Sequence, residues 1–489
     1  MGRCRRAMAA GAALLMSGAC TPALPSGGGG SAAVAPTSNA RWTPPASLAR
    51  DTTLPRVAVP ADLAARIARL TLGDVVDLAL RNSPTTRESW ATARTAAATF
   101  GSQRGEYFPT LDLTGNVTRI KTVASQGRSA VTQWVYGPSL TLSYLLLDFG
   151  GRSGRIEDAR QALFAANFAH NQAIQDVVLA TEVAYFNYVA QNALLAAQQV
   201  TLKEAETNLA AADERRSVGV ATIADVLQAR TAASQAQLAL ETTEGARQTA
   251  RGALALALGY PANLPYDVDS TAAEVTVGAV ADSVDSLIVA AIRLRPDLAQ
   301  ARAQVAAANA GVTAARGARL PTLNLTGTGG RTYTSTLTRG GNNYTVSLGL
   351  AVPIFNGFSV EYNEEAARSE GDFARARLDL LQQQAAFQVF SAYYALQTST
   401  RRVRTAQDLM TSATQSLEAA RARYKEGVGS VLDLLTAQTA LADARAQQVQ
   451  ARLEWQTSLA QLAHDTGLLD PHGGSNLHIT SDSTAVPNR

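Results

Sequence analysis

The sequence predicts a mainly α-helical fold with a smaller β part, built as an internal tandem duplication. Two long Ala-rich stretches with helical spacing are each interrupted by a short glycine turn, at Gly219 and at Gly427. Ahead of each stretch lies a pair of segments in which apolar and polar residues alternate, the pattern of a half-buried β-strand. Helix, strand pair and long helical hairpin therefore occur in the same order in both halves of the chain.

The composition limits the class of protein. Of the 489 residues 46% are hydrophobic, yet the mean hydropathy is -0.03, so the sequence does not predict a helical membrane protein. Aromatic residues make up only 6%, and alanine is abundant, which suits long helices packed through small side chains. The formal net charge of +3 comes entirely from Arg3, Arg5 and Arg6. The rest of the chain is neutral and lacks the charge excess typical of nucleic-acid binding.

Residues 1–19 have the features of a bacterial signal peptide. Three arginines precede an apolar stretch from Ala7 to Met16, and small residues from Ser17 onward lead to Cys20. The segment resembles a lipoprotein signal, which predicts that Cys20 becomes the first residue of the mature chain and receives a covalent lipid such as palmitate. Because Thr21 rather than Asp follows Cys20, the expected location is the outer membrane.

The signal departs from the usual lipoprotein pattern at Ser17, where Leu is common. The alternative is ordinary cleavage after Ala19, which leaves Cys20 as a thiol. Cys4 lies inside the signal, so the mature chain has at most one cysteine and no internal disulfide. Residues 20–65 are rich in Pro, Gly and Ser, which predicts a lipid-anchored tether without a core of its own.

The first repeat, residues 66–270, opens with two predicted helices. Thr71 and Asp74 have the spacing of a capping box ahead of a short helix over about 71–82. Pro84 then stands at the first position of a longer helix that ends near Gly105.

The second repeat, residues 271–467, opens in the same way. A short helix is predicted from Ser283 to Leu294, and Pro296 begins a longer helix that ends near Gly317. In the resemblance described below, both short helices belong to an equatorial belt. A C-terminal tail, residues 468–489, completes the chain.

Each repeat contains two predicted strands of about ten residues, with aromatic residues near their ends. They cover about 109–119, 138–148, 321–330 and 343–353. Leu348 and the other apolar residues face one side, and Ser347 and the other polar residues face the opposite side. This pattern is typical of a membrane β-barrel. Four strands cannot close a barrel, and an open edge cannot face lipid, so several chains are expected to share one barrel.

The long helices are predicted to form two hairpins with glycine tips. Their ranges are about 154–215 with 222–258, and 359–424 with 430–463. Sixty helical residues extend about 90 Å. Gly219 and Gly427 end the first helix of each hairpin in the left-handed conformation that glycine adopts at low cost. A Thr or Ser then N-caps the returning helix, and Asp225 and Asp433 stand where a capping box needs an acid.

Residues 71–467 resemble the TolC-type outer-membrane efflux proteins, in the lipoprotein branch that works with resistance-nodulation-division pumps. The supporting motifs are Pro-Thr-Leu at 109–111 and 321–323, Arg-Pro-Asp-Leu at 295–298, Phe-Asn-Gly at 355–357, and the two glycine tips. The resemblance implies a homotrimer. Its three chains form a 12-stranded transmembrane β-barrel that continues as a long periplasmic α-helical barrel.

The same resemblance implies the function of an exit duct in a tripartite efflux system. Such a duct passively conducts drugs or other small molecules across the periplasm and the outer membrane. The implied partners are a periplasmic adaptor protein, an inner-membrane resistance-nodulation-division pump and outer-membrane lipid. Two alternatives stay open. One is a conduit for type I protein secretion, which has the same fold; the other is a helical envelope spacer without a channel, which would not need the alternating strands.

The sequence shows no sign of enzymatic chemistry. It contains no Walker A motif, no dinucleotide fingerprint and no His/Cys set with metal-ligand spacing. The four histidines, His170, His464, His472 and His478, are scattered, and surface or core positions are expected for them. We therefore expect no catalysis, no metal and no cofactor other than the lipid on Cys20.

The resemblance also implies a periplasmic gate at the tips. An acid at the position of Asp433 points into the channel, where three copies form a carboxylate ring, and Tyr424 links neighbouring helical pairs with Asp225 as its acidic partner. Two positions depart from the family pattern, because Gly429 replaces a basic residue and Thr436 replaces a second ring acid. The capping box is an alternative explanation for both Asp225 and Asp433, and the two roles are compatible.

Overall fold

The structure is a computed structural model of the chain. It describes residues 69–122, 130–263, 266–268, 279–280, 282–335, 340–469 and 479–480. The predicted signal peptide, Cys20 and the tether lie outside the described residues, as do His472, His478 and most of the tail. The described part is mainly helical with a small antiparallel sheet, which confirms the fold class at this level. None of its helices has both the length and the apolar character needed to cross a membrane.

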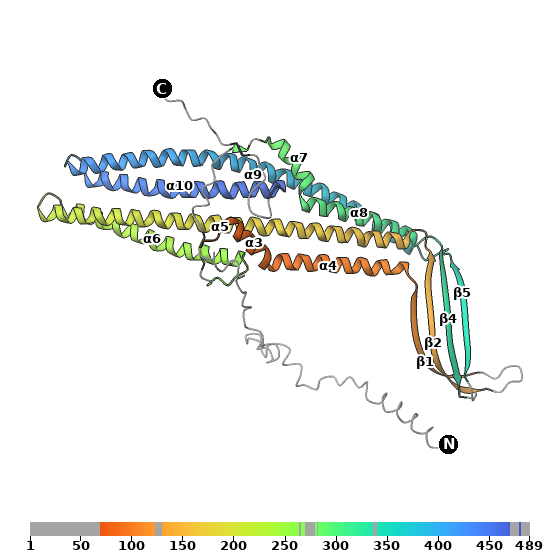
Figure 1. Ribbon diagram of the computed structural model, residues 1–489. Coiled ribbons are helices and arrows are strands. Elements are labelled where there is room, and N and C mark those ends of the chain that lie inside the picture. Colours follow the sequence, from red (N-terminus) through yellow and green to blue (C-terminus); the bar gives the residue numbers. More distant parts are fainter. Residues whose placement is uncertain are drawn as a thin grey trace, which may run out of the picture. The chain divides into compact units, whose positions relative to one another are not determined.

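Two consecutive helices open each half of the described chain (Figure 1). They are α3 (Leu72–Asn82) and α4 (Pro84–Arg104), and α7 (Val284–Leu294) and α8 (Pro296–Gly317). Thr71 and Asp74 form the predicted capping box, with the Asp74 N–H donating to Thr71 Oγ1 at 3.3 Å and the Thr71 N–H donating to Asp74 Oδ2 at 3.1 Å. Local side-chain chemistry therefore sets where α3 begins.

Four strands form one antiparallel sheet in the order β1-β2-β4-β5. They are β1 (Thr110–Lys121), β2 (Thr132–Leu147), β4 (Thr322–Thr334) and β5 (Gly341–Ala351). The two hairpins join through β2 and β4, so β1 and β5 are the edges and pair with no further strand in the described part of the chain. β2 begins well before the predicted start near 138, because the strand pairing continues back through Tyr136 and Trp134 to Thr132.

One face of this sheet is apolar across all four strands. Leu111 lies opposite Leu142 between β1 and β2, and Leu325 lies opposite Leu348 between β4 and β5. Ser347 points to the other, polar face, as its position in the alternation requires. Leu111 and Leu348 are 62% and 65% exposed, so the chain itself leaves the apolar face uncovered.

Two hairpins of long helices follow the two strand pairs. They are α5 (Gly151–Ser217) with α6 (Ile223–Ala257), and α9 (Ser359–Lys425) with α10 (Val431–Thr466). Within each hairpin small residues allow close packing, with Ala205 against Ala236 in the first and Leu441 and Ala444 in the buried seam of the second. α5 also packs against α8 and α10, so it connects the two halves.

Glycine permits a close approach of α5 and α8 next to the sheet. A Cβ atom on Gly154 would lie 2.5 Å from the backbone nitrogen of Ala314, and one on Gly317 would lie 2.4 Å from Gly151 Cα. Any side chain at these positions would force the two helices apart. The contact therefore fixes how the second strand pair is placed beside the first.

An apolar core lies where α3, α5, α7, α9 and α10 meet, away from both the sheet and the tips. Its centre is Trp455, which is 2% exposed. Buried neighbours come from all of these helices: Val76, Val178, Leu287, Val389 and Leu462. Two short strands, β3 (Ala279–Val280) and β6 (Ile479–Thr480), pair with each other. The core ties the two halves together at the level where α10 ends.

Candidate functional site at the helical tips

Both tips close with the same backbone motif. Gly219 and Gly427 have φ angles of 78° and 77°, in the left-handed region. The N–H of Val220 donates to the Arg215 carbonyl at 2.9 Å, and the N–H of Val428 donates to the Arg423 carbonyl at 3.0 Å. These bonds, with those of the two glycine N–H groups, are the Schellman pattern that satisfies the last carbonyls of a helix.

Asp225 and Asp433 both form capping boxes at the start of the returning helices. The Thr222 N–H donates to Asp225 Oδ2 at 2.8 Å, and the Asp225 N–H donates to Thr222 Oγ1 at 3.2 Å. In the second tip Ser430 and Asp433 exchange the same two bonds, at 3.3 and 3.1 Å. Asp433 is nevertheless exposed, so its carboxylate still faces solvent in the single chain. The capping role explains why an acid stands here and leaves room for a second role.

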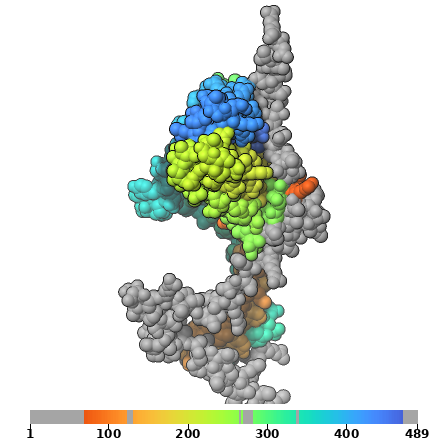
Figure 2. Space-filling model, turned by 90° about the vertical axis from the view of Figure 1, so that its left-hand side faces the viewer, coloured from red at the N-terminus to blue at the C-terminus, as the bar shows by residue number. Residues whose placement is uncertain are grey.

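Arg215 joins the two tips. Its guanidinium donates to the carbonyls of Tyr424 and Lys425 at 3.0 and 3.3 Å, and its Cζ lies 4.1 Å from the centre of the Tyr424 ring. The positive charge thus meets the C-terminal end of α9, where free carbonyls and the helix dipole favour a cation. Figure 2 shows the two tips against each other, the α5–α6 tip in yellow-green and the α9–α10 tip in blue.

Sequence reasoning missed Arg215. The resemblance suggested Asp225 as the partner of Tyr424, whereas within one chain Tyr424 lies against Arg215 and Asp225 bonds to Thr222. A signal was present, because a basic residue near a helix C-terminus commonly binds the last carbonyls. The sequence pattern does not indicate that these carbonyls belong to α9 rather than to the helix that carries Arg215.

Gly429 lies in a crowded position at the second tip. Its N–H donates to the Arg423 carbonyl at 3.1 Å, and a Cβ atom on it would lie 3.0 Å from Arg423 Cβ. The basic residue expected from the resemblance is absent here, and Gly429 instead lies in tight contact with the last turn of α9. Thr436, the other departure from the pattern, is exposed on α10.

Polar side chains hold the two hairpins together above the tips. Asn208 of α5 donates from Nδ2 to Gln438 Oε1 of α10 at 2.6 Å, and Arg445 of α10 forms an ion pair with Glu204 of α5 at 3.1 Å. Both ionic side chains are largely buried, at 18% and 21% exposed, so breaking the pair would leave uncompensated buried charges. A movement of one tip against the other must therefore break specific polar bonds.

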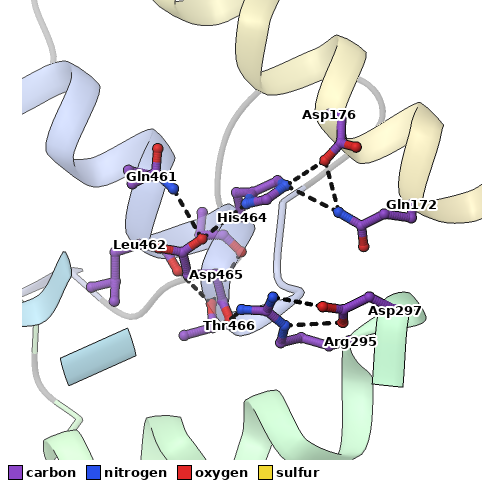
Figure 3. A network of polar contacts seen from close by, with 10 residues as sticks. Gln172, Asp176, Arg295, Asp297, Gln461, Leu462, His464, Asp465 and Thr466 are labelled. Atoms are coloured by element: carbon purple, nitrogen blue, oxygen red, sulfur yellow. Dashed lines mark hydrogen bonds and ion pairs between the residues drawn. The ribbon is translucent and has the colours of Figure 1, made fainter. Parts of the chain in front are cut away.

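A second polar network lies at the opposite end of α10 (Figure 3). His464 Nε2 lies 2.9 Å from Asp176 Oδ1 of α5, and its Nδ1 lies 3.0 Å from Asp465 Oδ1. Arg295, between α7 and α8, pairs with Asp297 at 2.8 Å and donates to the Asp465 carbonyl at 3.1 Å. The network therefore connects α5, α10 and the α7–α8 junction.

The charge of His464 follows from its two carboxylate neighbours. Burial lowers the pKa of His464, but the hydrogen bonds and charges of Asp176 and Asp465 outweigh burial and raise the pKa to about 9. For Asp176, burial raises the pKa, but the bonds from His464 and Gln172 outweigh it, and the net shift is downward. His464 is thus a charged, largely buried link between helices, whereas the sequence indicated only a surface or core histidine.

Comparison with known proteins places this geometry in context. The family model described as "Outer membrane efflux protein" matches residues 75–260 and 287–468. Protein CyaE of Bordetella pertussis is 29% identical over 410 residues, which cover 83% of this chain and 85% of CyaE. Outer membrane protein OprJ of Pseudomonas aeruginosa is 30% identical over 376 residues, or 74% of this chain and 77% of OprJ.

A solved structure has the same fold. The crystal structure of a membrane protein from Pseudomonas aeruginosa matches with a TM-score of 0.72 and 27% sequence identity, covering 84% of this chain and 97% of that one.

Proposed function

This chain belongs to the outer membrane efflux protein family, and from this premise we propose that it is the outer-membrane channel of a tripartite efflux system. The channel is passive: it offers a path for drugs or other small molecules, and an energised pump elsewhere drives the transport. A periplasmic adaptor protein and an inner-membrane resistance-nodulation-division pump complete the system.

The observation that supports this function best is the sheet with one uncovered apolar face and two open edges. An open edge facing lipid leaves backbone groups without hydrogen bonds, which costs several kcal/mol per group. Pairing β5 of one chain with β1 of the next removes every edge. We propose a homotrimer, in which three sheets close into a 12-stranded transmembrane β-barrel.

The long helices continue this barrel on the periplasmic side. α5 and α9 have 67 residues each, so each extends about 100 Å. Each chain supplies two long helices, α5 and α9, and two further columns made of shorter helices, α4 with α6 and α8 with α10. Three chains therefore place twelve helical columns around one tunnel. The recurring order of elements supports an internal duplication, with repeats at residues 66–270 and 271–467.

The tips form the proposed gate of this tunnel. Asp433 is exposed at the start of α10, and three-fold symmetry brings its three copies to one level. Tyr424 and Asp225 complete the proposed gate, and the contact of Arg215 with Tyr424 holds the two tips of each chain together. A covalent lipid on Cys20 anchors the tether to the outer membrane.

Conductance in planar lipid bilayers tests this function. The purified full chain is expected to give discrete, long-lived conductance steps, and native mass spectrometry is expected to give the mass of three chains. A protein that inserts without conductance, or that is a monomer in lipid, would contradict the channel and leave the helical spacer as the better interpretation.

A further inference from the structure

Three cations lie on the sheet at the ends of the strands farthest from the helices. Arg119 and Lys121 belong to β1, and Arg331 belongs to β4. Arg119 and Lys121 are an even number of residues from Leu113 in β1, and Arg331 is an even number from Leu325 in β4. Because every second side chain of a strand points to the same face, all three cations lie on the apolar face. They are the only cations of the four strands, and all three are exposed.

Aromatic rings lie beside two of these cations, Arg119 and Arg331. Arg119 lies opposite Trp134 and its Cζ is 5.6 Å from that ring, while Arg331 Cζ is 5.4 Å from the Tyr333 ring. Tyr333 in turn stacks on Tyr136 of β2 with ring centres 5.5 Å apart. A band of Trp and Tyr on the apolar face is typical of the level where hydrocarbon gives way to polar headgroups.

No carboxylate of the sheet neutralises these cations. Asp112 is the one acid in the four strands, and it lies on the polar face near the helices, opposite Thr141. The sequence has no Asp or Glu from Leu113 to Leu147, nor from Leu298 to Val360. Any anion that pairs with the three side chains must therefore come from outside the hairpins.

The helix end of the sheet is built differently. There Arg155 pairs with Glu106 at 2.7 Å, and Arg316 and Arg319 pair with the buried carboxylate of Glu364 at 3.0 and 3.1 Å. The chain thus supplies its own counter-charges on one side of the apolar band and none on the other. This asymmetry matches a membrane whose two surfaces differ in charge.

We propose that Arg119, Lys121 and Arg331 bind the phosphate groups of phosphorylated lipids in the outer leaflet of the outer membrane. The inference rests on the proposed function, because that function makes the apolar face the lipid-facing side and the hairpin ends the outer side. A cation on a lipid-facing strand is costly at the midplane but tolerated at the interface. Arg also recognises phosphate with paired donors, and basic clusters at a membrane surface bind anionic headgroups.

The test compares lipid binding by two matched triple variants of the full chain. The first is Arg119→Gln, Lys121→Gln and Arg331→Gln. The control is Lys203→Gln, Arg216→Gln and Arg230→Gln, which removes the same charge from exposed helix positions. The probe is bisphosphorylated lipid A, compared with the same lipid after enzymatic removal of its phosphates and with free inorganic phosphate.

Wild type and the control are expected to bind bisphosphorylated lipid A about 100-fold more tightly than the first variant. Each of the three cations is expected to contribute about fivefold in affinity. They are also expected to prefer it over the dephosphorylated lipid, and the first variant is expected to lose that preference. Equal binding by all three proteins, or by both lipids, would overturn the inference. Inorganic phosphate binding as tightly as lipid A would overturn it too, since the lipid would then play no part.

Bilayer conductance separates this inference from the proposed function. The first variant is expected to keep wild-type conductance, because its substitutions lie outside the tunnel. Conductance without phosphate-dependent lipid binding would refute the lipid site and leave the channel intact. Absence of conductance in the wild type would refute the channel itself.

Discussion

His464 lies between carboxylates of two helices, and its protonation therefore affects how α5 and α10 are held together. Its pKa is raised to about 9, above the ordinary value of 6.5. A group whose folded-state pKa is raised stabilises the fold fully below its unfolded pKa and loses that effect as pH rises through the folded pKa. The relevant window is therefore pH 6.5 to 9, and neutral pH lies near its stabilised end.

We expect His464→Gln to destabilise the protein at pH 6 and to be nearly neutral at pH 10. The pKa shift corresponds to about 3 kcal/mol at low pH, since one unit is about 1.4 kcal/mol. The measurement is thermal unfolding followed by circular dichroism at several pH values, for both proteins side by side. A difference in melting temperature that does not change with pH would show that the charge of His464 contributes nothing.

Asp433 can be tested for a role beyond its capping box. Three carboxylates at one level of a tunnel attract cations, as acidic rings do in cation-selective pores. Asp433→Asn keeps an acceptor for the cap but removes the charge, so we expect reduced cation selectivity of the bilayer conductance. Asp225→Asn, in an equally built tip, is the control and is expected to keep the wild-type selectivity. Unchanged selectivity in Asp433→Asn would leave only the cap, worth about 0.5–2 kcal/mol.

The contacts of some site residues can be predicted from the sequence, and those of others cannot. The capping boxes at Asp225 and Asp433 depend on partners three positions away, so spacing alone predicts both, and the structure contains both. Arg215 and Tyr424 lie on different hairpins, and only the packing of α5 against α10 brings them together. His464 is similar, because Asp176 reaches it through tertiary structure.

At the level of elements, the two faces of the sheet have opposite requirements. Leu348→Arg places a charge on the apolar face, which costs about 2–4 kcal/mol near the membrane midplane. Ser347→Arg places the same charge on the polar face one residue away and is expected to be tolerated. Trimer yield from membranes, measured by native electrophoresis, distinguishes them. Equal yields would mean that Leu348 does not face lipid.

The glycine tips give a second prediction for an element. At a φ of 77° an Ala in place of Gly427 costs about 1–2 kcal/mol. Gly245, inside α6 with open space around it, should respond in the opposite way, because Gly245→Ala gains about 1 kcal/mol of helix propensity. Hydrogen exchange at the tip amides is expected to rise in Gly427→Ala and to fall or stay unchanged in α6 for Gly245→Ala. A slower exchange in Gly427→Ala would contradict the left-handed turn.

The sequence predicted the existence of each strand better than its ends. Alternation and the repeated Pro-Thr-Leu starts locate the helix-side ends near Thr110 and Thr322, where the strands begin. At the hairpin ends, polar residues such as Thr132 and Gln133 look like a loop but pair in β2. The pairing of β2 with β4 has no local signal, since it joins residues from different halves.

At the level of the whole molecule, two devices attach the proposed channel to the membrane, and they can be separated. Cys20→Ser is expected to abolish labelling by fatty acid, because the thiol that receives the lipid is gone. The variant is expected to remain in the outer membrane and to conduct, since the proposed barrel does not depend on the lipid for insertion. The measurement is metabolic labelling with palmitate, followed by membrane fractionation. No label on the wild type would show that ordinary cleavage after Ala19 occurs instead.

The equal lengths of α5 and α9, 67 residues each, have a consequence for how this chain can change over evolution. The two helices must keep equal lengths, because Arg215 near the end of α5 contacts Tyr424 near the end of α9 only when the two helix ends are level. One inserted residue in α5 alone would advance its tip by about 1.5 Å and rotate it by about 100°, taking Arg215 away from the ring. Changes of length are therefore expected in both helices together, in steps that preserve the packed faces, such as seven residues or two turns.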